Sequence, residues 1–227
     1  MFEKIKKYLK ERNNSISDRI IPNKQIFKLM HKHFKRVGNF GTATLILADI
    51  DNFRNLVEMY GEEIGEKVLR EVSQRFAALL PLEASISIMH TDGILVFIPD
   101  EGAQSRVEKL CKKMLEVVKL SSHTEELQNI SLSASIGVCT YPQSGSTVKE
   151  LLEGVDLATF VSKRSGGNKV TSYYATLSND EKNNMIQYEE IRTAIQKKEF
   201  VLYYQPIIDI TNQNLFGAEA LMRWNHP

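Results

Sequence analysis

Residues 42–51 read Thr-Ala-Thr-Leu-Ile-Leu-Ala-Asp-Ile-Asp, and this stretch decides the fold. Its first seven residues are almost all β-branched, small or apolar, which is typical of a strand buried on both faces of a sheet. Two carboxylates, Asp49 and Asp51, follow at the end of that strand. Carboxylates in this position form a candidate site for a divalent cation. The structural alternative is a strand-end cap at Asp49 and, at Asp51, an N-cap for a helix beginning at Phe53.

The segments on either side of this strand predict further helices and strands. Residues 22–37 have apolar side chains at helical spacing, with Pro22 in the first turn. Residues 53–80 predict two helices separated by Gly61 and Gly65. The later elements are a helix at 104–120, a strand at 130–140, a helix at 148–163 closed by Gly166-Gly167, and a strand at 169–174.

A β-hairpin is predicted in the middle of the domain. Asp92-Gly93 stands between the β-like runs 84–90 and 94–98, and Asp-Gly in that setting is a strong hairpin signal. The resulting order, β-α-α-β-β-α-β-α-β, indicates an α/β (α+β) ferredoxin-like split βαβ fold with an added helix and edge strand. We expect a central, mostly antiparallel five-stranded sheet flanked by helices.

The pattern predicts four segments along the chain. Residues 1–17 form an N-terminal amphipathic helix and linker, because five Lys/Arg alternate with apolar residues at helical spacing up to Asn14. This helix is interpreted either as a membrane-surface or dimerising element, or as one that packs on the domain or frays. The main domain covers 18–176, a linker helix 177–199, and a strand pair 200–227.

Composition narrows the class of protein. The chain has 227 residues, 42% hydrophobic and 25% charged, which is ordinary for one or two soluble globular domains. The net charge of +1 provides no strong field toward nucleic acid or acidic membranes. No apolar run reaches the ~18–20 residues of a membrane span, and no signal-peptide core is present. Cys111 and Cys139 are isolated, so we expect two buried, reduced thiols in a cytoplasmic protein. From the net charge we expect no binding to nucleic acid.

The turn of the predicted hairpin reads Thr91-Asp92-Gly93-Ile94-Leu95. In a ferredoxin-like sheet this turn lies opposite Asp49. Two-metal phosphoryl transfer would require a second carboxylate on the turn and open backbone N–H groups for phosphate oxygens. Asp92 instead places a like charge near the phosphates, which costs a few kcal/mol at ~4 Å. Gly93 supplies no carboxylate and the next two residues are apolar, so the turn provides at most part of the groups that a two-metal site requires.

A set of different short motifs is dispersed over residues 18–174. They are Asp49-Ile50-Asp51-Asn52-Phe53-Arg54, Tyr60-Gly61, Gly65-Glu66-Lys67-Val68-Leu69, Ser135-Ile136-Gly137-Val138, Tyr141-Pro142, Leu151-Leu152, Asp156-Leu157-Ala158, Lys163 and Gly166-Gly167-Asn168-Lys169-Val170. In kind and spacing they resemble the GGDEF domain of diguanylate cyclases, which condense two GTP into cyclic di-GMP. The resemblance implies a nucleotidyl-cyclase-like fold and a nucleotide site at the end of the first strand.

The site residues that the resemblance implies are only partly kept. Asp49 matches the first metal aspartate of the family, and Lys163 matches a phosphate-contacting lysine. Val57 stands where an asparagine reads guanine, and loss of such hydrogen bonds costs roughly 10⁴-fold or more in discrimination. Glu66 replaces a second guanine-reading aspartate but still accepts a hydrogen bond, and Gly167 replaces an arginine. The inhibitory RxxD motif, expected at residues 82–85, is absent, so product inhibition there is not expected.

The signature loop departs furthest from the family. Where the resemblance calls for Gly-Gly-Asp-Glu-Phe, the chain has Thr91-Asp92-Gly93-Ile94-Leu95. The first hypothesis is therefore a catalytically inactive, degenerate GGDEF domain that regulates or positions a partner in cyclic di-GMP signalling. Its expected partners are a second copy of the chain or a GGDEF or EAL domain, with no cofactor in this chain.

Residues 200–227 resemble the opening of an EAL domain, the cyclic di-GMP phosphodiesterase, through Tyr204-Gln205-Pro206-Ile207 and the run 217–227. The resemblance makes Glu219 a metal ligand and places Gln205 and Arg223 against the dinucleotide. An EAL domain is a TIM-like barrel of roughly 200 residues or more. Only its start is present, and one Glu cannot hold a catalytic ion. Mg²⁺ or Mn²⁺, and cyclic di-GMP, are expected only with a complete EAL domain.

Two alternative functions remain open. In one, which the intact Glu219 and Arg223 favour, the chain is the N-terminal portion of a cyclic di-GMP phosphodiesterase whose barrel lies beyond Pro227. In the other, the altered site binds GTP as a sensor without turnover, which Asp49 and Lys163 favour.

Overall fold

The computed structural model describes residues 18–89, 92–119, 131–173, 187, 190–191 and 193–226. The predicted amphipathic helix at 1–17 and most of the linker helix at 177–199 lie outside these ranges. The chain divides into two compact units, Met1–Leu177 and Ser178–Pro227. Each unit is described by itself.

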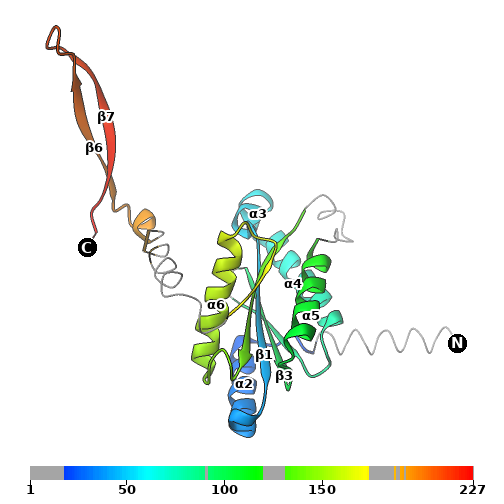
Figure 1. The fold of residues 1–227 in the computed structure, drawn as a ribbon. Coiled ribbons are helices and arrows are strands. Elements are labelled where there is room, and N and C mark those ends of the chain that lie inside the picture. The colour runs from blue at the N-terminus through cyan, green and yellow to red at the C-terminus, as the bar shows by residue number, and fades with distance from the viewer. Residues whose placement is uncertain are drawn as a thin grey trace. The chain divides into compact units, whose positions relative to one another are not determined.

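A five-stranded sheet forms the centre of the first unit and confirms the predicted fold class (Figure 1). The central strand β1 pairs antiparallel with β3 on one side and with β4 on the other, and β4 pairs parallel with β5. The predicted hairpin is formed by β2 and β3. In sheet order the strands are β2 Ser85–Ile88, β3 Gly93–Pro99, β1 Ala43–Ile50, β4 Ala134–Tyr141 and β5 Val170–Ser172.

Helices cover both faces of this sheet, because β1 alternates its side chains between two cores. Ile46, Ala48 and Ile50 face one core, together with α4 (Glu62–Leu79) and α5 (Gln104–Val118). Ala43 and Leu45 face the other core, to which α2 (Asn23–Val37) and α6 (Val148–Arg164) contribute. Figure 1 shows α6 on one side of the strands and α4 with α5 on the other. The short helix α3, Phe53–Tyr60, follows β1 directly.

The prediction that both Gly61 and Gly65 separate two helices is wrong for Gly65. Gly61 separates α3 from α4 with a φ of 88°, whereas Gly65 lies inside α4 and is buried. A Cβ at Gly65 would lie 2.8 Å from Cγ2 of Val57 and 3.1 Å from Cζ of Phe53. Gly65 is therefore a contact point that allows α3 to pack closely on α4, and the helix continues through it.

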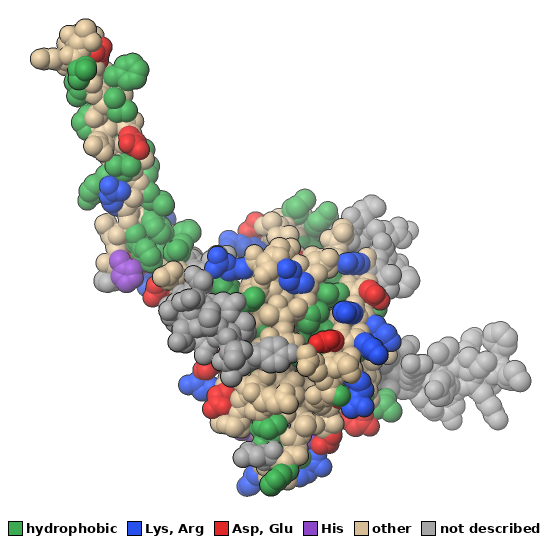
Figure 2. Space-filling view, viewed as in Figure 1, with side chains coloured by type: hydrophobic (Ala, Val, Ile, Leu, Met, Phe, Trp, Pro, Cys, Tyr) green, Lys and Arg blue, Asp and Glu red, His purple; other side chains and the backbone are tan. Residues whose placement is uncertain are grey.

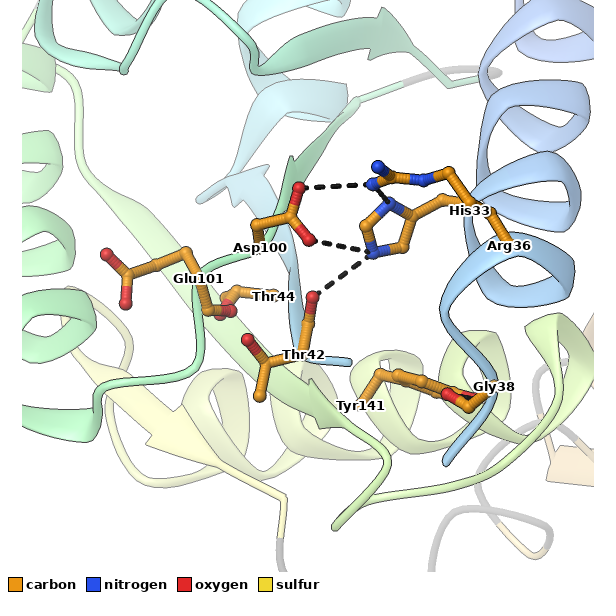
Figure 3. A network of polar contacts seen from close by, with 8 residues as sticks. All are labelled: His33, Arg36, Gly38, Thr42, Thr44, Asp100, Glu101 and Tyr141. Atoms are coloured by element: carbon orange, nitrogen blue, oxygen red, sulfur yellow. Dashed lines mark hydrogen bonds and ion pairs between the residues drawn. The ribbon is translucent and has the colours of Figure 1, made fainter. Parts of the chain in front are cut away.

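At the end of the sheet remote from Asp49, a polar network fixes α2 (Figure 3). Nε2 of His33 lies 3.2 Å from the Thr42 carbonyl oxygen, and Arg36 donates to Nδ1 of His33 at 3.1 Å and to Asp100 at 3.2 Å. The Tyr141 hydroxyl donates to the carbonyl of Gly38 at the C-terminus of α2. These bonds hold α2 at one position on the sheet.

The outer edge of β2 is covered by the segment that enters the domain. The Ile21 amide donates to the Ile86 carbonyl, and the Ile86 amide donates to the Arg19 carbonyl, both at 2.8 Å. The Arg19 guanidinium donates to three carbonyl oxygens at the C-terminal end of α4 and just beyond it, those of Ala77, Leu80 and Pro81. This edge therefore offers few open backbone groups to another strand.

The second unit contains an antiparallel hairpin of β6 (Phe200–Ile208) and β7 (Leu215–Trp224), as predicted. Figure 2 shows hydrophobic side chains along both strands. Most of them are exposed; Tyr204 and Phe216, for example, have exposed fractions of 67% and 80%. Among the described residues no helix is both long and apolar enough to cross a membrane.

Candidate functional site

Three charged side chains meet where β1 ends. Asp49, the penultimate residue of β1, pairs across the sheet with Gly93 of β3, so the hairpin turn lies beside it. Lys163, in the last turn of α6, reaches the same point. Its Nζ lies 2.6 Å from Oδ2 of Asp49 and 3.9 Å from Oδ2 of Asp92. The structure thus brings together the predicted Asp49, Asp92 and Lys163 around one ammonium group.

Asp49 is poorly solvated for a carboxylate. Its side chain is 15% exposed, and its Oδ1 is buried without a hydrogen-bond partner among the described residues. Burial raises the pKa of Asp49 to about 7; Lys163 opposes this shift, and the negative charges of Asp92 and Asp51 add to it. Desolvation therefore outweighs the close ion pair with Lys163, and the carboxyl group titrates near neutrality.

Asp51 has a different role from the predicted N-cap. The residue before α3 is Asn52, with a φ of 57° and no capping bond from its side chain. The Asp51 carboxylate instead accepts bonds from the hydroxyls of Ser133 at 2.6 Å and Ser135 at 2.7 Å, and from the Asn168 amide at 3.0 Å. Asp51 therefore ties the end of β1 to β4 and to the loop after α6. These partners are far from it in sequence, so local spacing could not reveal them.

We expect Asp51→Ala to lower the free energy of unfolding by roughly 3 kcal/mol, since it removes three hydrogen bonds to a charged acceptor and leaves their donors unpaired. Urea denaturation monitored by circular dichroism measures this loss. The conservative Ser133→Ala variant removes one of the three bonds and should cost about 1 kcal/mol. Equal stability of Asp51→Ala and the parent chain would refute the proposed tie.

The signature stretch is mostly buried strand. Gly93 begins β3, and the next two residues, Ile94 and Leu95, are 0% and 1% exposed and belong to the opposite cores of the sheet. Apolar side chains sealed in this way offer no ligand to a cation or a phosphate. Thr91 lies outside the described residues.

Comparison with protein families identifies the domain. The model of the diguanylate cyclase GGDEF domain matches residues 16–169, and the EAL model matches residues 188–227. The chain belongs to the GGDEF family.

The GGDEF chain is similar to longer bacterial proteins. It is 28% identical over 186 residues to the bifunctional diguanylate cyclase/cyclic di-GMP phosphodiesterase MucR of Pseudomonas aeruginosa, covering 81% of this chain and 26% of MucR. It is 29% identical over 202 residues to the cyclic di-GMP phosphodiesterase NbdA of the same organism, covering 88% of this chain and 25% of NbdA. The chain thus spans about a quarter of the length of these relatives.

Solved structures agree on the fold. A structure of YfiN from Pseudomonas aeruginosa that comprises only the GGDEF domain superposes with a TM-score of 0.66 at 15% identity. The superposition covers 74% of this chain and 95% of that one. At this identity the likeness concerns the fold alone.

The described residues of this GGDEF domain do not fit a two-metal site. Asp49 offers one carboxylate, but the Lys163 ammonium already lies against it at hydrogen-bond distance. Both oxygens of Asp51 accept bonds from Ser133, Ser135 and Asn168. Within the described ranges no group of three or more His, Cys, Asp or Glu could hold a metal ion. The unpartnered Oδ1 of Asp49 and the Asp92 carboxylate, which also faces Lys163, are fewer protein ligands than a two-metal site requires.

Val57 and Glu66, the positions expected at the guanine edge, lie on α3 and α4 of the GGDEF domain. Val57 is half-buried and packs against the hydrophobic core, whereas Glu66 is exposed. No hydrogen bond or ion pair between described residues joins either one to Asp49. Val57 therefore contributes packing between the two helices rather than a polar contact.

The three residues that the EAL resemblance assigns to a site, Gln205, Glu219 and Arg223, occupy one face of the hairpin. Gln205 lies directly opposite Glu219 in the register, and Arg223 follows Glu219 by four residues, so their side chains project to the same side. All three are exposed. The guanidinium of Arg223 donates to the carbonyl of Met222 at 3.0 Å. The hairpin thus arranges these residues together, but its described residues include no group of three or more side chains that could hold a metal ion.

Proposed function

We propose that this chain is a regulatory and interaction domain of the GGDEF family without diguanylate cyclase activity, attached to the start of an EAL domain in a cyclic di-GMP signalling protein. The observation that supports this proposal is the Asp49–Lys163 pair at 2.6 Å beside a hairpin that has Gly93 instead of a carboxylate. The Lys163 ammonium lies against Asp49 and also faces Asp92, and among the described residues no group of three or more His, Cys, Asp or Glu could complete a metal site there. The similarity to MucR, a bifunctional diguanylate cyclase/cyclic di-GMP phosphodiesterase, and to NbdA, a cyclic di-GMP phosphodiesterase, supports the signalling context.

The test is product formation from GTP with Mg²⁺ or Mn²⁺, measured by chromatography of cyclic di-GMP. We expect no product above the level of an Asp49→Asn variant, which retains the size of the side chain but removes the carboxylate that matches the family's first metal aspartate. A GGDEF domain with an intact signature loop, assayed in parallel, shows that the conditions support turnover. Product that disappears in Asp49→Asn would overturn the proposal.

A sensor function for the same site is the second candidate. The half-exposed Lys163 ammonium lies between Asp49 and Asp92 and provides one cationic contact for a phosphate group. Val57 gives the guanine edge no hydrogen bond. Calorimetry with GTP and Mg²⁺ tests this candidate, and heat that is lost in Lys163→Gln would support it. The absence of heat at millimolar GTP would reject it.

A phosphodiesterase function belongs to a complete EAL domain. It is favoured by the placement of Gln205, Glu219 and Arg223 on one face of the hairpin. The sequence that follows Pro227 in the gene tests this alternative, because a barrel must add further Asp and Glu ligands there.

A further inference from the structure

The outward face of α2 carries a stripe of cations. Lys24, Lys28, Lys32 and Lys35 are all exposed and recur at intervals of three or four residues, so they form one row along the helix. The helix contains no Asp or Glu, and no ion pair with a described acid engages any of these four lysines. The buried Ile26 and Met30 lie on the opposite side of the helix. We call the four lysines the α2 stripe.

The charge of the chain is unevenly distributed. Residues 1–38 contain eleven Lys/Arg and three Asp/Glu, which leaves eighteen Lys/Arg against twenty-five Asp/Glu in residues 39–227. The overall charge of +1 therefore hides a cationic N-terminal part and an acidic remainder. Such segregation along the sequence indicates a partner that contacts the cationic part of the chain.

Two exposed apolar residues are close to the stripe in the sequence. Leu29 of α2 is 38% exposed, and Phe40, in the short 3₁₀ turn that follows α2, is fully exposed. Figure 2 shows Lys and Arg side chains at the lower end of the first unit, where α2 lies in Figure 1. A cationic row beside an exposed aromatic residue has the chemistry of a segment that lies in the interface of an anionic bilayer.

We propose that the α2 stripe and Phe40 dock this domain on a membrane surface that carries anionic lipids. A bilayer fits better than a protein partner, because lysine is depleted at protein interfaces, which favour arginine, tyrosine and tryptophan. It also fits better than nucleic acid, since a planar surface meets the stripe without wrapping onto the acidic remainder of the chain. The long lysine stems lie along the headgroups and keep their charges in water.

Vesicle flotation tests this docking with the whole chain, using phosphatidylcholine vesicles with and without phosphatidylglycerol. We expect binding only to the anionic vesicles, and release at about 0.5 M salt because the attraction is screened. Replacing all four lysines of the α2 stripe by glutamine should lower partition at least about a hundred-fold, at about five-fold per lysine. Phe40→Ser should lower it by a further factor of about ten or more.

The matched control replaces four other exposed lysines of the same unit, Lys109, Lys112, Lys113 and Lys119 on or next to α5, by glutamine. It changes the net charge equally and should keep at least a tenth of the parent binding. Circular dichroism confirms that each variant is folded. Equal losses in both quadruple variants, or no binding of the parent to anionic vesicles, would overturn the proposal. Binding of an oligonucleotide or an acidic peptide through the α2 stripe without vesicle binding would also overturn it.

Discussion

Amides of the hairpin β6–β7 should exchange with deuterium at least about a thousand-fold faster than those of β1. A hairpin of two strands is at best marginally stable in water, so its opening free energy is close to zero. Its side chains are exposed along nearly its whole length. The contacts at its base include the tilted rings of Phe200 and Trp224, with centroids 5.4 Å apart, and the bond that Trp224 Nε1 donates to Glu199. Strand β1 opens only with the core, which requires several kcal/mol.

Hydrogen exchange followed by mass spectrometry measures both strands in one experiment. Strand β4, which pairs with β1, provides the internal standard for slow exchange. Trp224→Ala should speed exchange in the hairpin and leave β1 and β4 unchanged. Protection of residues 200–224 equal to that of β1 would show that the hairpin packs against a surface in solution.

The Asp49→Asn variant should be more stable than the parent chain at pH 8 by roughly 2–4 kcal/mol. The pKa of Asp49 is raised to about 7 in the folded protein, against about 4 in an unfolded chain. Between these values the folded state holds a proton that the unfolded state releases, so the free energy of unfolding falls as pH rises from about 4 to about 7. Above pH 7 the full free-energy cost of burying the ionised Asp49 carboxylate is present, and the neutral asparagine removes this cost.

Urea denaturation across pH 4–8 checks this result. The parent should lose stability over that range, and Asp49→Asn should lose much less. Burial also raises the pKa of Asp156 to about 6, which lowers the free energy of unfolding with rising pH in the same way. The Asp156→Asn variant measures how much of the pH dependence comes from Asp156. Lys163→Met should steepen the loss, because it removes the cation that opposes the shift at Asp49. If Asp49→Asn is no more stable than the parent at pH 8, the Lys163 pair outweighs the burial of the carboxylate.

Local patterns predicted most of the fold. The conformations of the apolar run at 42–48 and of the Asp92-Gly93 turn are determined mainly by residues adjacent in the sequence. In the structure the run is the central strand of the sheet, and the turn belongs to the β2–β3 hairpin. The prediction that Gly65 ends a helix was wrong. Glycine weakens a helix through its conformational freedom, but inside a helix it also lets a second helix pack closely. Only the position of Phe53 and Val57 against it distinguishes the two cases.

The candidate site was less predictable, because its contacts join distant parts of the chain. The sequence placed Asp49 opposite the hairpin turn, which the register confirms. The resemblance assigned Asp49 and Lys163 to one nucleotide site, but it did not predict that they form a direct ion pair, or that Ser133 and Ser135 hold Asp51. Ser133 and Ser135 follow Asp51 by 82 and 84 residues in the sequence. They can be recognised as its partners only when β4 is known to pair with β1.

The two units differ in how their sheet edges are protected. The segment Arg19–Ile21 closes the edge at β2, and β5 at the other edge is only three residues long. The hairpin β6–β7 has two long edges with exposed Leu202, Tyr204 and Phe216 along it. Long apolar edges recruit further strands from other molecules. Self-association at high protein concentration should therefore arise in residues 200–224, and a chain shortened to Leu177 should remain monodisperse under the same conditions.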